Sequence, residues 1–146
     1  MTNPQGMFAY ACLGTADLQR AVRFYDAVMA TLGHRRCDTR DEPGWDDWAG
    51  WGLYEDEGRI QDALWVCRPF NGGPPHPGNG VMLALRARSR AEVRAFHAAA
   101  LAHGGTSEGE PGLRTHYSPD FYAAYVRDPD GNKLAVVCRA AEPEGR

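Results

Sequence analysis

The apolar positions in the first half of the chain alternate between the period of a strand and that of a helix. Residues 7–14 form a short apolar run that is typical of a buried strand. Asp17 then caps a predicted helix, whose apolar positions recur with the helical period as far as Gly33. Two further strands are predicted at residues 34–39 and 61–68.

The second half repeats this order after a linker. Residues 71–80 contain so many glycines and prolines that neither a helix nor a central strand fits there. Residues 81–87 predict a strand, and Ser89 with Glu92 three positions later forms the capping box of a second helix. This helix is expected to end at the Gly-Gly pair that begins with Gly104.

A β-hairpin is predicted at residues 125–139. Apolar residues alternate on both sides of the sequence Asp-Pro-Asp-Gly-Asn, which begins at Asp128. The proline fixes one φ, Asp130 can accept a hydrogen bond from its own backbone, and Gly131 tolerates a positive φ. The turn is therefore specified by its chemistry.

The two halves of the chain have the same order of predicted elements. The helix caps Asp17 and Ser89 are 72 residues apart (89 − 17), and each half reads as β-α-β-β-β. We expect one α+β domain over residues 1–146. Its parts are module 1 at about 7–70, the linker at 71–80 and module 2 at about 81–139. Because one helix covers only one face of a sheet, the uncovered faces are expected to enclose a cleft.

Composition is that of an ordinary soluble globular domain and argues against several partners. Of 146 residues, 43% are hydrophobic and 24% are charged. The net charge of −3 argues against nucleic acid or an anionic membrane as the main partner, and no apolar run has the length of a membrane span. The N-terminus lacks the pattern of a secretory signal, so a cytoplasmic location is expected. The four cysteines have no CxxC spacing, which predicts reduced thiols.

Three segments carry a family resemblance: YACLGTADLQRAVRFYDAVMATLG, GNGVMLALRARSRAEVRAFHAAALAHGG and GLRTHYSPDFYAAYVRDPDGNKLAVVCR. They resemble the first strand and helix, the matching second-half segment and the closing hairpin of the vicinal oxygen chelate superfamily. This superfamily includes glyoxalase I, bleomycin-resistance proteins and extradiol dioxygenases, and the last segment is similar to a glyoxalase-like branch of mostly unassigned activity. The resemblance implies paired βαβββ modules and a homodimer.

The resemblance also implies where a metal would be bound. Enzymes of the superfamily hold a divalent metal with His, Gln or Glu on the first, fourth, fifth and eighth strands. The corresponding positions here are Tyr10, Leu64, Met82 and Ala135. A phenol with a pKa near 10 is a poor ligand, a thioether suits mainly copper(I), and leucine and alanine have no donor atom. We therefore expect no cofactor at the usual site; a divalent metal would need a non-standard one.

Strand alternation, counted from those four positions, predicts the side chains that line the cleft. They are mostly apolar, which is typical of a pocket for a small aromatic or aliphatic molecule. The predicted lining residues are Phe8, Tyr10, Cys12, Leu64, Val66, Met82, Ala84, Ala135 and Val137. The same alternation turns Cys67 and Cys138 toward the helices. The alternative is that these side chains pack on one another and leave no cleft.

A polar cluster is predicted at the mouth of the cleft. Its members are Arg114, His116, Tyr117, Asp120 and Tyr122. His116 can act there as an acid or base, because imidazole titrates near neutral pH; the alternative is an imidazole bonded to the loop backbone. Tyr10 and His116 are the candidate catalytic residues, and Tyr117 and Tyr122 join the lining as candidate substrate-binding residues.

Residues 41–58 break the periodic pattern and predict a loop-rich segment. It holds Trp45, Trp48 and Trp51 together with seven carboxylates. The tryptophans are expected either to wall the pocket as a stacking surface or to form a dimer contact. The acidic residues would attract a cation, unless the loop is simply solvated.

Three functions are compatible with these features. The leading one is a homodimer that binds a small molecule without a metal, or an enzyme with an altered site. The second is a lyase or dioxygenase with a relocated metal, held by His116 with Asp120 or a cysteine. The third is a structural role in which the Trp-rich segment contacts a partner protein.

Overall fold

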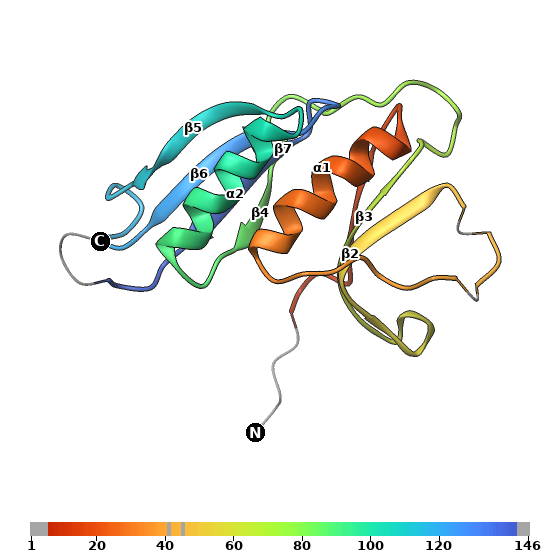
Figure 1. Ribbon diagram of the computed structural model, residues 1–146, viewed down its shortest axis with the longest axis horizontal. Helices are drawn as coiled ribbons and strands as arrows, with labels where there is room; N and C mark the ends of the chain where they lie inside the picture. Colours follow the sequence, from red (N-terminus) through yellow and green to blue (C-terminus); the bar gives the residue numbers. More distant parts are fainter. Residues whose placement is uncertain (1–5, 41, 45, 143–146) are drawn as a thin grey trace.

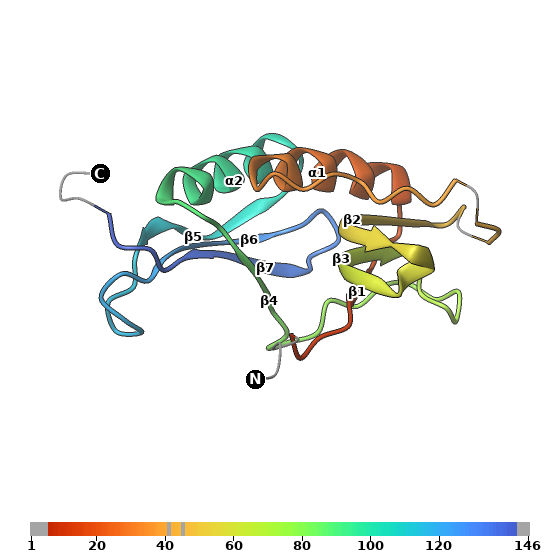
Figure 2. The same cartoon turned by 90° about the horizontal axis from the view of Figure 1, so that it is seen from below.

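The computed structural model describes residues 6–40, 42–44 and 46–142. Two sheets lie side by side, and both helices cover the same face of them (Figure 1 and Figure 2). The first sheet has the order β1 (Ala11–Gly14), β3 (Ile60–Cys67), β2 (Trp48–Glu55). The second has the order β4 (Leu83–Arg86), β7 (Lys133–Cys138), β6 (Tyr122–Arg127), β5 (Thr106–Leu113). The expected α+β architecture of two modules is confirmed.

The pairing of strands is the same in the two modules. β1 runs parallel to β3 and β4 runs parallel to β7, whereas the other neighbouring strands are antiparallel. The first helix, α1 (Leu18–Thr31), follows β1, and the second, α2 (Arg90–Ala102), follows β4. A 3-10 turn, η1 (Asp56–Gly58), joins β2 to β3. Between β3 and β4, residues 68–82 form no helix or strand.

Both helices begin at the predicted caps. The Asp17 carboxylate accepts a hydrogen bond from the Arg20 N–H at 3.1 Å, and the Ser89 hydroxyl accepts one from the Glu92 N–H at 3.1 Å. The Glu92 carboxylate accepts from the Arg88 N–H at 2.8 Å, one residue before the cap. These bonds satisfy N–H groups that have no partner within the helix.

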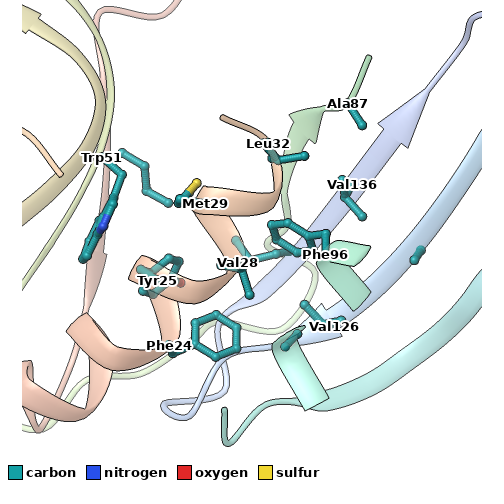
Figure 3. Close-up of a cluster of buried hydrophobic side chains, with 14 of the residues drawn as sticks. Phe24, Tyr25, Val28, Met29, Leu32, Trp51, Ala87, Phe96, Val126 and Val136 are labelled. Atoms are coloured by element: carbon teal, nitrogen blue, oxygen red, sulfur yellow. The ribbon is translucent and has the colours of Figure 1, made fainter. Parts of the chain in front are cut away.

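A single hydrophobic core lies between the helices and the two sheets (Figure 3). α1 contributes its fully buried Phe24, Tyr25 and Val28, and α2 contributes Val93 and Phe96. The helices also pack directly against each other. The modules therefore share one core.

Two predictions for the first module are wrong. Residues 34–39 make only an isolated bridge between Arg36 and Trp51, and the middle of residues 41–58, predicted as a loop, forms the eight-residue strand β2. Gly50 and Gly52 conceal this strand, because glycine in a strand usually signals a bulge or a break. Here Gly50 makes room for a ring, since a Cβ at that position would collide with Trp65.

The closing hairpin is confirmed, with β6 and β7 paired from Arg127 opposite Lys133 onward. Gly131 has the expected positive φ of 91°. The backbone of the turn is held by Asp128, whose carboxylate accepts from the N–H groups of Asp130 and Asn132 at 2.9 Å each. The expectation that Asp130 would bond its own backbone is wrong, because its carboxylate reaches the other module.

The turn joins the end of module 2 to the start of module 1 through three side chains, Asp128, Asp130 and Asn132, which we call the turn clamp. Asp130 accepts hydrogen bonds from the Thr15 hydroxyl at 2.5 Å, the Ala16 N–H at 2.9 Å and the Arg20 guanidinium at 2.8 Å. Asn132 donates to the Gly14 carbonyl at 3.0 Å, and Asp128 accepts from the Tyr25 hydroxyl at 2.6 Å. The conspicuous turn motif is thus a structural connection.

Candidate ligand-binding cleft

The open face of the second sheet forms a cleft of about 1230 Å³. Its floor consists of Ala84 on β4 with Ala135 and Val137 on β7. These residues alternate with Leu83, Leu134 and other side chains that face the helices, so the small side chains point away from the core. Because the floor residues are small, the sheet leaves space above it.

Aromatic rings from the segment between β5 and β6 form one wall of the cleft. The ring centroids of His116 and Tyr117 are 4.1 Å apart, and those of Tyr117 and Phe121 are 4.9 Å apart. The segment is folded back on itself, because the Arg114 N–H donates to the Phe121 carbonyl at 2.7 Å. Side chains of this kind can stack on a flat organic molecule.

Tyr125 lines the cleft beside the floor, where it is paired with Ala135 across β6 and β7. The Arg114 guanidinium is 5.5 Å and the Lys133 ammonium 5.7 Å from the centroid of its ring. Burial raises the pKa of the Tyr125 phenol, as does the nearby Tyr117, whereas Arg114 acts in the opposite direction. Tyr125 is therefore a neutral hydrogen-bonding group at physiological pH.

Of the eight predicted binding residues, four line the cleft: Met82, His116, Tyr117 and Ala135. Phe8 and Tyr10 lie before β1 and do not contribute to the walls of the cleft. Phe8 is 78% exposed and Tyr10 is 55% exposed. The expected orientation of these two side chains into the cleft is not observed.

Leu64 faces the opposite way from the prediction. It is 4% exposed and belongs to the core, as does Val66. Trp65 instead occupies the open face, because it is flanked by Cys12 and Gly50 as Ala135 is flanked by Ala84 and Tyr125. The last strands of the two modules, β3 and β7, therefore match at an offset of 70 residues (135 − 65), and not at the 71 residues that separate Leu64 from Ala135. A shift of one residue turns every side chain of a strand to the other face.

The same one-residue error affects the predicted orientation of Cys67. Cys138 faces the helices as predicted, but Cys67 lies on the open face of module 1, with its Sγ 3.6 Å from that of Cys12. Burial raises the pKa of the Cys67 thiol to about 12, with a further contribution from the Cys12 thiol. Cys67 is therefore a neutral thiol at physiological pH.

The predicted polar cluster is divided between the two faces of the sheet. Tyr122 packs against the core, and its hydroxyl accepts a weak hydrogen bond from Arg94 of α2 at 3.4 Å. Asp120 lies 3.5 Å from the Arg90 guanidinium, also on α2. Only Arg114, His116 and Tyr117 of the cluster line the cleft. The expected role of Tyr122 in the cleft is wrong, because strand alternation sends it to the helix side.

The open face of module 1 is filled by an aromatic cluster, which consists of Trp48, Tyr54, Trp65 and Phe70. Ring centroids are 5.1 Å apart for Tyr54 and Trp65, 6.4 Å for Trp48 and Trp65, and 5.4 Å for Trp48 and Phe70. The Trp65 indole N–H donates to the Gln61 side chain at 2.7 Å. Here side chains occupy the space that stays open in module 2.

Trp48 and Trp51, the two tryptophans of this segment that the structure describes, do not wall the cleft in the way that was expected. Trp51 is 2% exposed in the core, where its indole donates to Asp26 at 2.8 Å, and Trp48 belongs to the aromatic cluster. Trp45 and Asp41 lie outside the described residues. Several acidic residues of this segment gather instead around a small hollow next to η1. They are Glu42, Glu55, Asp56 and Glu57, with Asp38 beside them.

The profile of the glyoxalase/bleomycin resistance protein/dioxygenase superfamily matches residues 7–136. The chain belongs to this superfamily. A glyoxalase/bleomycin resistance protein from Albidiferax ferrireducens T118 has a similar structure, with 34% identity and a TM-score of 0.76 over 92% of this chain and 100% of that chain. A comparison with curated proteins found no match.

Solved structures with lower sequence identity share the fold. A glyoxalase-related enzyme from Fulvimarina pelagi has 20% identity and a TM-score of 0.65, over 97% of this chain and 94% of that one. Lactoylglutathione lyase from Agrobacterium tumefaciens has 22% identity and a TM-score of 0.57, over 93% and 96% of the respective chains. No helix among the described residues has both the length and the apolar character needed to cross a membrane.

The side chains at the superfamily's metal positions do not fit a divalent metal. With the corrected offset, these positions hold Tyr10, Trp65, Met82 and Ala135. The indole N–H of tryptophan is only a donor, alanine has no ligand atom, and the remaining thioether and phenol are poor partners for hard or borderline cations. The chemistry of this donor set therefore cannot supply the usual metal centre.

Three basic side chains of the cleft, Arg86, Lys133 and Arg139, are residues that sequence reasoning missed. Arg86 follows Ala84 by two positions, and Arg139 follows Val137 by two, so strand alternation places both on the open face. Lys133 precedes Ala135 by two positions and lies on the same face. Continuing the alternation past the apolar residues would have found all three.

Proposed function

We propose that the protein binds a small organic molecule in the cleft of module 2 without the help of a metal ion. One observation carries this proposal: the strand positions that serve as metal ligands in the superfamily hold side chains without suitable donors, yet the cleft around Met82 and Ala135 is open. Its volume of about 1230 Å³ can receive a drug-sized molecule.

The lining supports this role because its parts differ in chemistry. The alanines and valine of the floor offer apolar contact, and the Tyr117 and Phe121 rings offer a stacking surface. Polar groups at the edge, including the Tyr125 hydroxyl, can orient a bound molecule. A pocket that is mainly apolar with a few placed polar groups is the usual form of a small-molecule site.

Catalysis by His116 is a second candidate function. The imidazole is exposed, contacts the Tyr117 ring at a tilt of 43°, and makes no hydrogen bond to any side chain or backbone group of the described residues. It is therefore available to a bound molecule as a general acid or base. Asp120, the suggested co-ligand of a relocated metal, pairs with Arg90 and lines no part of the cleft.

A homodimer is the assembly that we propose for this function. Module 1 exposes Phe70 at 85% and, before β1, Met7 at 86% and Phe8 at 78%. Large exposed apolar side chains are typical of contact surfaces. Light scattering would give twice the mass of one chain, and a Phe8→Ser, Phe70→Ser variant would be shifted toward the monomer; a monomeric wild-type protein would exclude this assembly.

The binding proposal can be tested by calorimetry with a panel of small aromatic compounds, in buffer with a chelator. Ala84→Trp would fill the floor of the cleft from an exposed position, and Ala30→Trp on the exposed side of α1 is the matched control. We expect hits that bind the wild type and the control but not Ala84→Trp. Binding that needs an added metal, or that Ala84→Trp leaves unchanged, would contradict the proposal.

A further inference from the structure

We infer that the ligand of the cleft is an organic anion, with a carboxylate or phosphate group on a flat apolar body. This inference rests on the proposed function and specifies the ligand class for that site. It starts from the charges around the cleft, which has five basic residues in its lining and one carboxylate. The basic residues are Arg86, Arg88, Arg114, Lys133 and Arg139, and the carboxylate is Glu108.

Two of these charges are already neutralised. Glu108 accepts a hydrogen bond from Arg127 at 3.0 Å, and Arg88 pairs with Glu92 at 3.0 Å. Among the described residues, no carboxylate lies within 4.0 Å of the charged nitrogens of the other four basic residues. These are Arg86, Arg114, Lys133 and Arg139. The cleft is therefore positive although the chain has a net charge of −3.

Arg86 and Arg139 are placed to hold one anionic group together. Arg86 lies opposite Val137 in the ladder between β4 and β7, and Arg139 is two residues further along the same face. Strand spacing and rise put their Cα atoms about 8 Å apart, a distance that two long side chains can close. A planar guanidinium donates two parallel hydrogen bonds to a carboxylate or phosphate, so this pair can bind such a group from two sides.

The other two cations stand against an aromatic ring. Arg114 is fixed by hydrogen bonds to the carbonyls of Glu110 at 2.7 Å and Gly112 at 2.8 Å, and both it and Lys133 approach the Tyr125 ring. Their charges add to the positive potential over the floor. Because low-dielectric walls focus the field in a concave site, a small anion is attracted more strongly there than on a flat surface.

The aromatic wall of the cleft indicates that the body of the ligand is flat and apolar. The Arg139 guanidinium lies 5.3 Å from the Phe121 ring centroid, so its charge and the stacking surface are adjacent. A flat body that stacks on Phe121 and Tyr117 would carry its anionic group toward Arg139. A cation is disfavoured in the cleft, because the basic residues of its lining would repel it. The acidic residues next to η1 lie around a different hollow, in module 1.

Calorimetry with three naphthalene derivatives tests the inference directly. The probes are 2-naphthoate, the neutral 2-naphthamide and the cationic 2-naphthylmethylammonium, which share one aromatic body. We expect naphthoate to bind about tenfold more tightly than the amide and the cation to bind most weakly, since a hydrogen-bonded charge contributes about one such factor. Added salt should weaken the binding of naphthoate and leave that of naphthamide unchanged.

Variants locate the effect. Arg86→Gln and Arg139→Gln should each weaken naphthoate binding about tenfold without affecting naphthamide. Arg139→Lys should keep part of the affinity because it keeps the charge, and the exposed Arg23→Gln on α1 is the matched control. The three substituted residues, Arg23, Arg86 and Arg139, are exposed, so unfolding curves should show that the variants remain folded.

The outcomes separate the two proposals. If naphthamide or the cation binds in the cleft as tightly as naphthoate, and the glutamine variants change nothing, the anion inference is wrong while the proposed function stands. If no probe binds, or if Ala84→Trp leaves the binding of every probe unchanged, both are wrong. Preference for naphthoate that disappears in Arg86→Gln and Arg139→Gln, but not in Arg23→Gln, supports both.

Discussion

The turn clamp predicts a large loss of stability when Asp130 is replaced. Its side chain is 3% exposed and accepts three hydrogen bonds, from Thr15, Ala16 and Arg20. Asp130→Ala removes all three acceptor contacts at once. Each hydrogen bond to a charged group contributes about 1.5–3 kcal/mol, so the upper bound is several kcal/mol.

Three features of the site reduce that bound. The Arg20 side chain is 40% exposed and the Ala16 N–H is near solvent, so water can replace the lost carboxylate at both. The buried Thr15 hydroxyl lies 3.0 Å from the Asp17 carbonyl and can turn to it. We therefore expect Asp130→Ala to lower the free energy of unfolding by about 2–3 kcal/mol, and Asp130→Asn, which keeps one acceptor oxygen, by roughly half as much.

Urea denaturation of the wild type and these variants measures the change, with Asp47→Ala as an exposed control on the same chain. The double variant Thr15→Val, Asp130→Ala should cost less than the sum of the single changes, because the two residues share one hydrogen bond. A loss of less than about 0.5 kcal/mol for Asp130→Ala would refute a structural role for the clamp, since surface substitutions commonly fall in that range.

Two further predictions concern module 1. Gly50→Ala should lower the free energy of unfolding by about 1–3 kcal/mol, because the added Cβ collides with the Trp65 ring; Gly50→Ala combined with Trp65→Leu should restore much of this in thermal or urea unfolding. The second prediction concerns the pKa of Asp26. Burial raises this pKa, but the hydrogen bonds from Arg36 and Trp51 lower it by more, so the ionised form of Asp26 favours the folded state. That stabilisation is present above the unfolded pKa of Asp and lost as the pH falls through the lower folded pKa; Asp26→Asn should flatten this acid limb of stability against pH, and an unchanged limb would contradict the assignment.

Much of the fold could be predicted because local chemistry determined it. Asp17 and Ser89 mark the helix starts through bonds to groups within three residues, and Gly131 allows the positive φ of the hairpin turn. The orientation of Leu64 depended on something longer in range, the register between two parallel strands of module 1. An error of one residue in that register assigned Leu64 to the open face although it lies in the core.

The candidate site was harder to predict than the fold. Met82 and Ala135 were found from the resemblance, as positions that correspond to metal ligands of the superfamily, but Tyr122 was assigned to the cleft because it is near His116 in sequence. Neighbouring residues of a strand point to opposite faces, so nearness in sequence does not mean a shared site. The charges of Arg86 and Arg139 become meaningful only once the structure shows that they border one concave surface without acidic partners among the described residues.

The aromatic cluster of module 1 shows how an internal duplication can divide labour. At matching places in the strand ladders, module 1 has Trp65 beside Gly50 and module 2 has Ala135 beside Tyr125. The large side chain of the pair is on β3 in module 1 and on β6 in module 2. The open face of module 1 is therefore filled, and that of module 2 stays hollow. A protein engineer could therefore vary the hollow copy freely for new ligands, while the plugged copy acts as a fixed scaffold through the core that the two share.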